Sequence, residues 1–180
     1  SGTAGNLITF KAFPGDECQG VLGGKKSDCR VVISTTNSPG AVISADYVRV
    51  EGFKFQVTAG SRCSVFGVES LGRTGVEFVN NALTGATSDT VYFKNMKNTL
   101  IRDNYVYLAA EDGIKGSFTD SVIEYNHFST PDYIKTAQCL GHPDGIDMNS
   151  GSINNLTIRY NTIYGYSQGI YFPNGPSEPK

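Results

Sequence analysis

The chain has 180 residues, of which 39% are hydrophobic and 18% are charged, and its formal net charge is -2. This length fits one ordinary domain or part of a larger one. The balanced charge is not that of a disordered tail and provides no basic surface, so we expect no nucleic-acid partner. No window approaches the ~20 continuous apolar residues of a membrane span. Abundant glycine, tyrosine and phenylalanine without tryptophan predict a turn-rich β protein.

The first residues bear on the compartment of the protein. The chain begins at Ser1 without a signal peptide, which is typical of a processed or shortened start. Cys18 and Cys29 flank a Gly-rich turn at a spacing that a disulfide can close, although buried free thiols fit equally well. The pairing of Cys63 and Cys139 stays open. Together with one N-glycosylation sequon at Asn155, these features favour a secreted or cell-surface protein.

An internal repeat organises the rest of the chain. Short apolar segments recur with an asparagine three residues after their central residue. The centres and their asparagines are Phe78 and Asn81, Ile101 and Asn104, Ile123 and Asn126, and Ile158 and Asn161. The first three centres are 23 and 22 residues apart, whereas the last step of 35 indicates an insertion. Alternating segments at 47–55 and 7–12 resemble earlier turns of the same repeat.

A second strand follows each centre. Its apolar residues are Val91, Ile114, Ile146 and Ile170, which lie 13, 13, 23 and 12 residues after their centres. The longest interval places the extra residues at about 130–141. Each short apolar row can be buried only against its neighbours, so the period predicts a parallel β-solenoid with stacked asparagines. We expect about six or seven coils ~4.8 Å apart in residues 1–172, followed by a Pro-rich tail at 173–180.

The opening Gly2–Ala12 with Pro14-Gly15-Asp16, together with the Ile-x-x-Asn and Asp-Gly-Ile repeats, resembles right-handed parallel β-helix proteins of the pectate-lyase-like superfamily. The resemblance covers roughly residues 2–172. It implies an all-β, right-handed parallel β-helix. Members of the superfamily include polysaccharide lyases, glycoside hydrolases, epimerases, tailspikes and adhesins, so the implied partner is a polysaccharide.

Strand alternation sorts the residues beside the second-strand centres into two outward rows. The preceding row is Thr90, Gly113, Gly145 and Gly169, and the following row is Tyr92, Lys115, Asp147 and Tyr171. We expect a sugar groove in which the glycines form a bare floor, tyrosine rings stack on sugars and charged groups hold substituents. Tight turns into each strand explain the glycines as well. Arg102, Glu124 and Arg159 share another outward row and predict a charge ladder.

Asp89, Asp112 and Asp144 precede the second strand in successive coils. Turn capping is the simplest role for such aspartates. A shared cation such as calcium, held by Asp112 and Asp144, is an alternative, as is direct catalysis. Asp112 and Asp144 belong to the densest group of ionisable residues. His142, Asp144 and Asp147 follow the insertion, Lys135 lies in it, and Glu111, Asp112 and Lys115 are expected one coil earlier. Loops that interrupt a solenoid commonly mark its binding face.

Two further resemblances imply different chemistries. The segment from His142 to Asp147 resembles the Asp-Gly-Ile-Asp stretch of polygalacturonase-like glycoside hydrolases, which implies hydrolysis by Asp144 and Asp147. The segment from Glu111 to Ser117 resembles the catalytic stretch of alginate-lyase and chondroitinase-B-like lyases, which implies Lys115 as base. An arginine acid of that second family has no match here, and His142 is the nearest substitute.

The sequence therefore predicts a polysaccharide lyase that acts on a uronate-containing chain by β-elimination. Lys115, with a pKa lowered by burial, or neutral His142 removes the proton α to the uronate carboxylate, while calcium or another cation neutralises that carboxylate. The expected substrate contacts are Tyr92, Gly113, Gly145, Tyr171, Lys135 and Glu111. A simple salt bridge between Lys115 and Asp147 is the structural alternative. A non-catalytic glycan-binding, adhesin or tailspike-like module is the functional alternative.

Overall fold

A computed structural model describes residues 1–18, 29–36, 38–58, 67–86, 88–107, 111–130, 143–149 and 151–172. The regular elements in this part of the chain are all β-strands. They are β1 (Ile8–Lys11), β2 (Val32–Thr35), β3 (Ala41–Val42), β4 (Val48–Glu51), β5 (Lys54–Val57), β6 (Val68–Leu71), β7 (Glu77–Val79), β8 (Ala82–Thr84), β9 (Val91–Lys97), β10 (Leu100–Arg102), β11 (Tyr105–Tyr107), β12 (Ile114–Glu124), β13 (His127–Ser129), β14 (Asp144–Asp147), β15 (Asn154–Arg159), β16 (Thr162–Tyr164) and β17 (Gln168–Tyr171).

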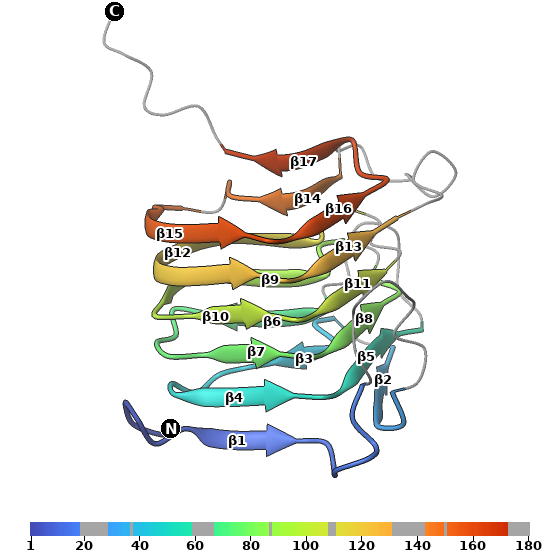
Figure 1. Cartoon of the computed structure of the whole chain (residues 1–180), viewed down its shortest axis with the longest axis vertical. Coiled ribbons are helices and arrows are strands. Elements are labelled where there is room, and N and C mark those ends of the chain that lie inside the picture. The colour runs from blue at the N-terminus through green and yellow to red at the C-terminus, as the bar shows by residue number, and fades with distance from the viewer. Residues whose placement is uncertain are drawn as a thin grey trace, which may run out of the picture.

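These strands pair in parallel between successive coils and form three faces. The first face contains β1, β4, β7, β10, the end of β12 and β15. The second face contains β2, β5, β8, β11, β13 and β16, and the third contains β3, β6, β9, the start of β12, β14 and β17. Figure 1 shows the coils stacked along one axis, with β1 near one end and β17 at the other. The predicted all-β parallel β-helix is confirmed.

The strand register follows the repeat in the sequence. Phe78 pairs with Ile101, Ile101 with Ile123, and Ile123 with Ile158. The earlier segments continue the same column, because Phe10 pairs with Val50 and Val50 with Phe78. Residues about one period apart are therefore vertical neighbours, as predicted.

One continuous apolar core fills the interior of the coils. Its largest fully buried side chains include Phe78, Phe93, Phe118 and Phe128. These side chains point inward from β7, β9, β12 and β13, which belong to different faces of the stack. The apolar side chains of each coil are therefore covered by those of the next coil. Full burial of such a side chain contributes roughly 1.5–3 kcal/mol, which makes the stack the main source of stability.

A buried asparagine ladder marks the corner between the first and second faces. The Oδ1 of Asn104 accepts a hydrogen bond of 2.9 Å from the Asn81 backbone N–H, and Asn126 accepts one of 2.9 Å from Asn104. Asn161 continues the series at 2.9 Å from the Asn126 backbone N–H. The residue before each ladder asparagine has a φ of 55° or 56°, which turns the chain sharply and places the amide inside. The predicted ladder is confirmed.

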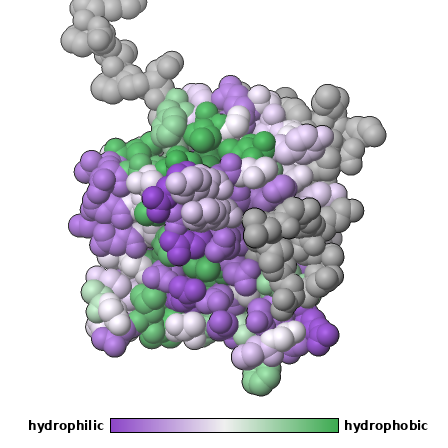
Figure 2. All heavy atoms as spheres, viewed as in Figure 1, coloured by the Kyte–Doolittle hydropathy of each residue, from purple (hydrophilic) through white to green (hydrophobic). Residues whose placement is uncertain are grey.

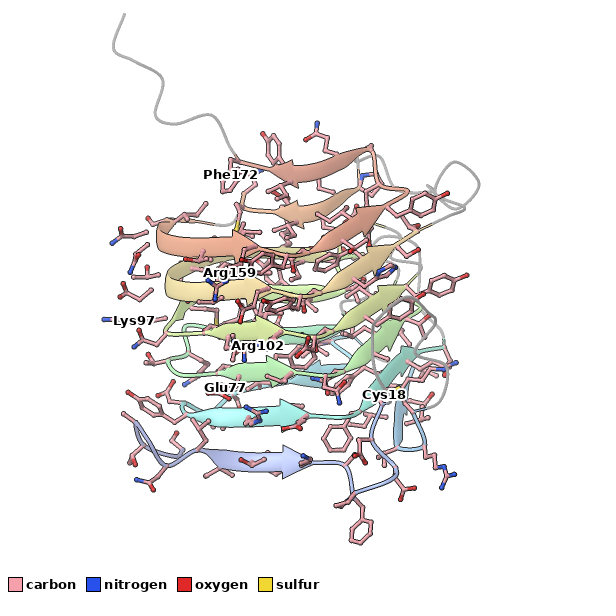
Figure 3. All side chains as sticks on the ribbon, viewed as in Figure 1. Cys18, Glu77, Lys97, Arg102, Arg159 and Phe172 are labelled. Atoms are coloured by element: carbon pink, nitrogen blue, oxygen red, sulfur yellow. A yellow bond between two sulfur atoms is a disulfide. The ribbon has the colours of Figure 1, made fainter. Side chains whose placement is uncertain are left out.

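The predicted charge ladder is also present on the first face. Glu124 is fully buried, and its two carboxylate oxygens accept hydrogen bonds of 2.6 Å from Arg102 Nε and Arg159 Nε. Arg102 on β10 and Arg159 on β15 lie on either side of the β12 strand that carries Glu124, and Figure 3 labels both arginines on this face. Burial alone would raise the pKa of Glu124, but its hydrogen bonds with the two arginines hold that pKa below its usual value.

The two ends of the stack differ from its middle in exposing apolar residues. A hollow of about 390 Å³ opens at the β1 end between Phe10, Ile33 and Val42. Figure 2 shows a largely polar front face, with hydrophobic residues gathered toward the β17 end. A disulfide joins Cys18 and Cys29, as the spacing allowed, and packs against Ala82. Cys63 and Cys139 lie outside the described residues.

Candidate functional site

The predicted outward row on the third face is real. Lys115 pairs with Tyr92 on one side and with Asp147 on the other, and Asp147 pairs with Tyr171. Four successive strands thus present a tyrosine, a lysine, an aspartate and a second tyrosine along the axis of the stack. The two tyrosines and Lys115 are half-buried, whereas Asp147 is buried.

Lys115 is surrounded by carboxylates from three coils. Its Nζ lies 3.0 Å from Asp112 Oδ2 and 3.1 Å from Asp147 Oδ2. A third carboxylate belongs to Asp89, whose Oδ1 lies 3.8 Å from the same nitrogen. The side chain of Lys115 is 28% exposed, while those of its three partners are no more than 6% exposed. The ammonium is therefore the accessible end of a buried acidic cluster.

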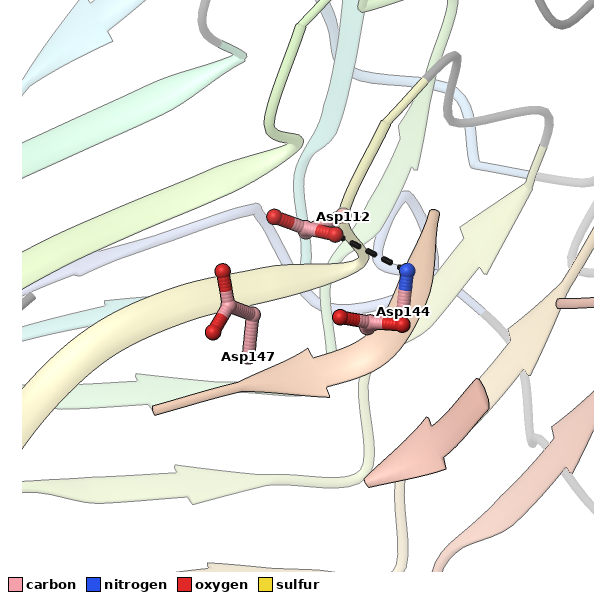
Figure 4. Close-up of side chains that lie close together, drawn as sticks. All are labelled: Asp112, Asp144 and Asp147. Carbon is pink, nitrogen blue, oxygen red and sulfur yellow. Dashed lines mark hydrogen bonds between the residues drawn. The ribbon is translucent and has the colours of Figure 1, made fainter. Parts of the chain in front are cut away.

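The turn before each strand of the third face positions these aspartates. The backbone N–H of Asp144 donates a hydrogen bond of 2.8 Å to Asp112 Oδ1, so Asp112 caps the next coil as predicted (Figure 4). Asp144 begins β14 and pairs with Gln168 of β17. Asp89, Asp112 and Asp144 lie above one another because each is at or just before the start of the third-face strand of its own coil.

The electrostatics of Lys115 differ from the prediction. Burial alone would lower the pKa of Lys115, but the charges of Asp89 and Asp112, together with hydrogen bonds to Asp112 and Asp147, raise it above its usual value. The expected lowering of this pKa is therefore wrong. With only these neighbours present, Lys115 is a cation at neutral pH and does not act as a base.

Burial has the opposite effect on the acids. It raises the pKa of Asp89 to about 8, with a further contribution from the nearby Asp112 charge, although Lys115 opposes the shift. It also raises the pKa of Asp147, despite the hydrogen bond from Lys115. Asp89 Oδ1 has no hydrogen-bond partner among the described residues. Asp89 is therefore mostly protonated at neutral pH, and its buried oxygen points toward Lys115.

The predicted glycine floor is wrong at Gly113 and Gly145, whereas Gly169 is exposed. Gly113 and Gly145 are buried, and a Cβ on Gly113 would lie 2.8 Å from the Phe128 ring. A Cβ on Gly145 would collide with the side chain of Ile163. Both glycines therefore let the chain bend closely past the apolar side chains of the second face, and neither is positioned to contact a sugar.

Three of the carboxylates could hold a cation together. Asp112, Asp144 and Asp147 each offer one oxygen, and these oxygens lie within 4.8 Å of one another. Carboxylate oxygens are the ligands that calcium prefers, so the donor set fits the expected cation and adds Asp147 to the two aspartates named from the sequence. Lys115 contacts two of the three and competes for the same oxygens. The buried, unpaired oxygen of Asp89 lies on the Lys115 side of this group.

Other predicted residues lie at the rim or cannot be placed. Glu111 Oε2 accepts a hydrogen bond of 2.9 Å from Ser88 Oγ, at the edge of the cluster. His142, Lys135 and most of the insertion lie outside the described residues. His127 stacks on Tyr105 at 5.1 Å on the second face, in keeping with a structural role.

The contact between Asp89 and Lys115 was not predicted from the sequence. The two residues are 26 positions apart in the chain, and Asp89 was interpreted only as one member of a row. Its partner could have been found from the repeat, because Asp89 precedes Tyr92 by three residues and Tyr92 is the vertical neighbour of Lys115.

Comparison with known proteins decides the family. Residues 26–179 match the family described as right handed beta helix region. The chain belongs to this family. For function, membership supports only a broad class, that of carbohydrate-active and other β-helix proteins. No curated protein and no solved structure matches the chain. In the described part of this right-handed β-helix protein, no helix has the length and apolarity needed to cross a membrane.

Proposed function

We propose that this right-handed β-helix protein is a polysaccharide lyase that cleaves a uronate-containing chain by β-elimination at the Lys115 cluster. The observation that carries the proposal is the half-exposed Lys115 ammonium, held by buried carboxylates in an outward row between Tyr92 and Tyr171. This row has charged side chains in the middle and a tyrosine at each end. Such an arrangement suits a sugar chain, because aromatic rings stack on pyranose faces and charged groups bind the substituents of the sugar. The resemblance of residues 111–117 to β-helix lyases supports the same position.

β-Elimination moves two protons and two pairs of bonding electrons, one from the C–H bond and one that leaves with the glycosidic oxygen. A base takes the proton on the carbon α to the uronate carboxylate, and the electrons of that C–H bond form a C=C bond to the next carbon. The bond from that carbon to the glycosidic oxygen breaks, and the oxygen takes a proton from a general acid. The products are a free hydroxyl on one fragment and an unsaturated uronate on the other.

In this proposal Lys115 has the acid half of the reaction, because three carboxylates hold its side chain as an ammonium at the surface of the cluster. As a cation it can donate its proton to the leaving oxygen. The base is then His142, which precedes Pro143 in the chain, and this assignment rests on the sequence alone. The proposal thus keeps both residues predicted from the sequence but exchanges the role of Lys115.

A cation would complete the arrangement. Asp112, Asp144 and Asp147 would hold it, and a bound calcium ion would neutralise the substrate carboxylate as charge develops there. Asp112 and Asp147 also contact Lys115, so Lys115 would share their oxygens with the cation. The Cys18–Cys29 disulfide supports action outside the cell, where disulfides persist and polysaccharides are available.

The test is turnover on polygalacturonate, alginate and chondroitin sulfate, followed by the ultraviolet absorbance of the unsaturated product. Lys115→Ala and His142→Ala should each lower kcat by a factor of about 10²–10⁴, which is the usual contribution of a general acid or base. Lys97→Ala, an exposed lysine on the neighbouring strand, is the matched control and should keep full activity. Turnover that survives the double substitution of Lys115 and His142 would rule out this site.

Two alternatives make different predictions. A non-catalytic glycan-binding module is favoured by the engagement of Lys115 with three carboxylates, and it predicts binding without turnover on every glycan. A glycoside hydrolase using Asp144 and Asp147 predicts new reducing ends without ultraviolet absorbance. The hydrolase receives less support, because Asp144 is only 1% exposed and Asp147 is paired with Lys115.

A further inference from the structure

The third face carries a second outward position beside the Lys115 row. Along β9 the side chains alternate, with Val91 and Phe93 buried while Tyr92 and Lys94 face outward. Lys94 is exposed and lies two residues beyond Tyr92, on the same side of the strand. Neither the sequence motifs nor the proposed chemistry uses Lys94.

Lys94 differs from Lys115 in having no carboxylate partner among the described residues. The nearest candidate on the adjoining strand is Glu69, which pairs with Tyr92 and is half-buried, but it forms no salt bridge with Lys94. The vertical neighbour of Lys94 on β6 is the exposed Leu71. The charge of the Lys94 ammonium is therefore not neutralised within this face.

The strand above leaves Lys94 uncrowded. Gly116 of β12 pairs with Phe93 and Phe118 pairs with Met96, so Ser117 is the one β12 residue opposite Lys94 and Asn95. The short side chain of Ser117 is buried and accepts a hydrogen bond of 2.8 Å from the Asn95 backbone N–H. A long side chain from the Lys115 coil does not cover Lys94. This leaves room for an outer ligand that reaches from the Lys115 cluster to β9.

The geometry points to an acidic-sugar subsite formed by Tyr92 and Lys94, one coil away from the Lys115 cluster. We infer that Tyr92 stacks against a pyranose ring and that Lys94 pairs with the carboxylate of the same sugar. Adjacent strands lie ~4.8 Å apart, close to the length that one pyranose adds to an extended polysaccharide. A chain lying along the axis therefore places successive sugars at Lys115 and at Tyr92.

Electrostatics gives the two positions different preferences. The Lys115 cluster holds one cation among several carboxylates, so it attracts an anionic sugar poorly without an added cation. Lys94 offers an uncompensated positive charge at the next sugar and favours a uronate over a neutral hexose. This inference rests on the proposed function, because it takes the polysaccharide to lie along the axis of the stack. It assigns Lys94 a role in selecting the substrate and none in the chemical step.

The experiment compares each acidic polysaccharide with its neutral ester: polygalacturonate with methyl-esterified pectin, and alginate with its propylene glycol ester. Affinity electrophoresis of the full chain gives the dissociation constants. Lys94→Ala should weaken binding to an acidic form by about two- to fivefold, the range of an exposed ion pair, and leave binding to the ester unchanged. Lys94→Arg should restore binding, and Tyr92→Ala should weaken binding to both forms.

Lys97→Ala is the control for general positive charge, because Lys97 belongs to the same strand but projects from the side of the stack (Figure 3). Equal losses in the Lys94 and Lys97 variants, an unchanged Lys94 variant, or a wild-type protein that binds neither acid would overturn the subsite. Turnover separates the two proposals. Cleavage without a Lys94 effect refutes the subsite alone, whereas Lys94-dependent binding without cleavage refutes the lyase alone.

Discussion

Replacing Lys115 with methionine tests how the acidic cluster is held together. Methionine keeps most of the length and volume of the side chain but removes the charge that contacts Asp112 and Asp147 at 3.0 and 3.1 Å. Loss of one partner from a buried ion pair typically costs 3–5 kcal/mol, because the remaining charge stays buried without compensation. An exposed pair contributes only 0.2–1 kcal/mol. Since the carboxylates are no more than 6% exposed, we expect a loss of about 3 kcal/mol at neutral pH.

The size of this loss should depend on pH. The pKa values of Asp89 and Asp147 are raised in the folded protein, so these groups contribute stability at low pH that is lost as the pH rises through their folded values. Removing the Lys115 charge raises both pKa values further. The deficit of the variant should therefore be smaller at acid pH and should grow as the pH rises through the Asp89 pKa of about 8.

Urea unfolding of the two proteins across this pH range, in the presence of a chelator, measures the difference in the free energy of unfolding. Lys97→Met is the matched control, because Lys97 is exposed and forms no salt bridge among the described residues. It should change stability by less than about 0.5 kcal/mol at every pH. A loss below about 1 kcal/mol for Lys115→Met, or a loss that does not grow with pH, would show that Lys115 acts as an ordinary surface lysine.

The remaining predictions concern single features of the stack. Asp89→Asn should remove the loss of stability that the wild type shows as the pH rises through the Asp89 pKa of about 8, and melting temperatures measured against pH would contradict this if both proteins lose stability alike. Asn104→Ala should lower the free energy of unfolding by about 2–4 kcal/mol, because it leaves the Asn81 backbone N–H and the carbonyl of Phe78 without their partner; an exposed control, Asn149→Ala, should have little effect. Calcium should raise the melting temperature of the wild type, and Asp144→Asn should reduce that shift, whereas an unchanged melting temperature would argue against the cation.

The sequence predicted vertical contacts well, because stacking converts a period in the chain directly into neighbours in space. The pairing of Ile101 with Ile123 and the ladder from Asn104 to Asn126 both follow from counting residues. The same rule correctly predicts that Lys115 lies beside Asp147. Long-range contacts in a solenoid are unusually accessible to sequence reasoning for this reason.

The sequence-based predictions were wrong at the bends, where side chains do not alternate between the two sides of a strand. Gly113 lies at the bend that leads into β12, and there two successive residues, Gly113 and Ile114, are both buried. Strict alternation across that bend predicts that Gly113 faces outward, whereas the residue is buried. The pKa of Lys115 was mispredicted for a related reason, because only Asp147 was paired with it, whereas the bend also brings Asp89 and Asp112 within reach.

Two buried ion clusters in this molecule provide a comparison that bears on function. Glu124 is one acid between two arginines on the first face, so its charge is fully compensated and its pKa is lowered. On the third face the ratio is reversed, with Lys115 as the one cation that the structure places among several acids, and the pKa of Asp89 is raised. A cluster that served only to join coils would gain from the balance found at Glu124, because uncompensated buried carboxylates are destabilising. The imbalance at Lys115 therefore favours a site that is completed by something from outside the chain, such as a cation with an acidic sugar.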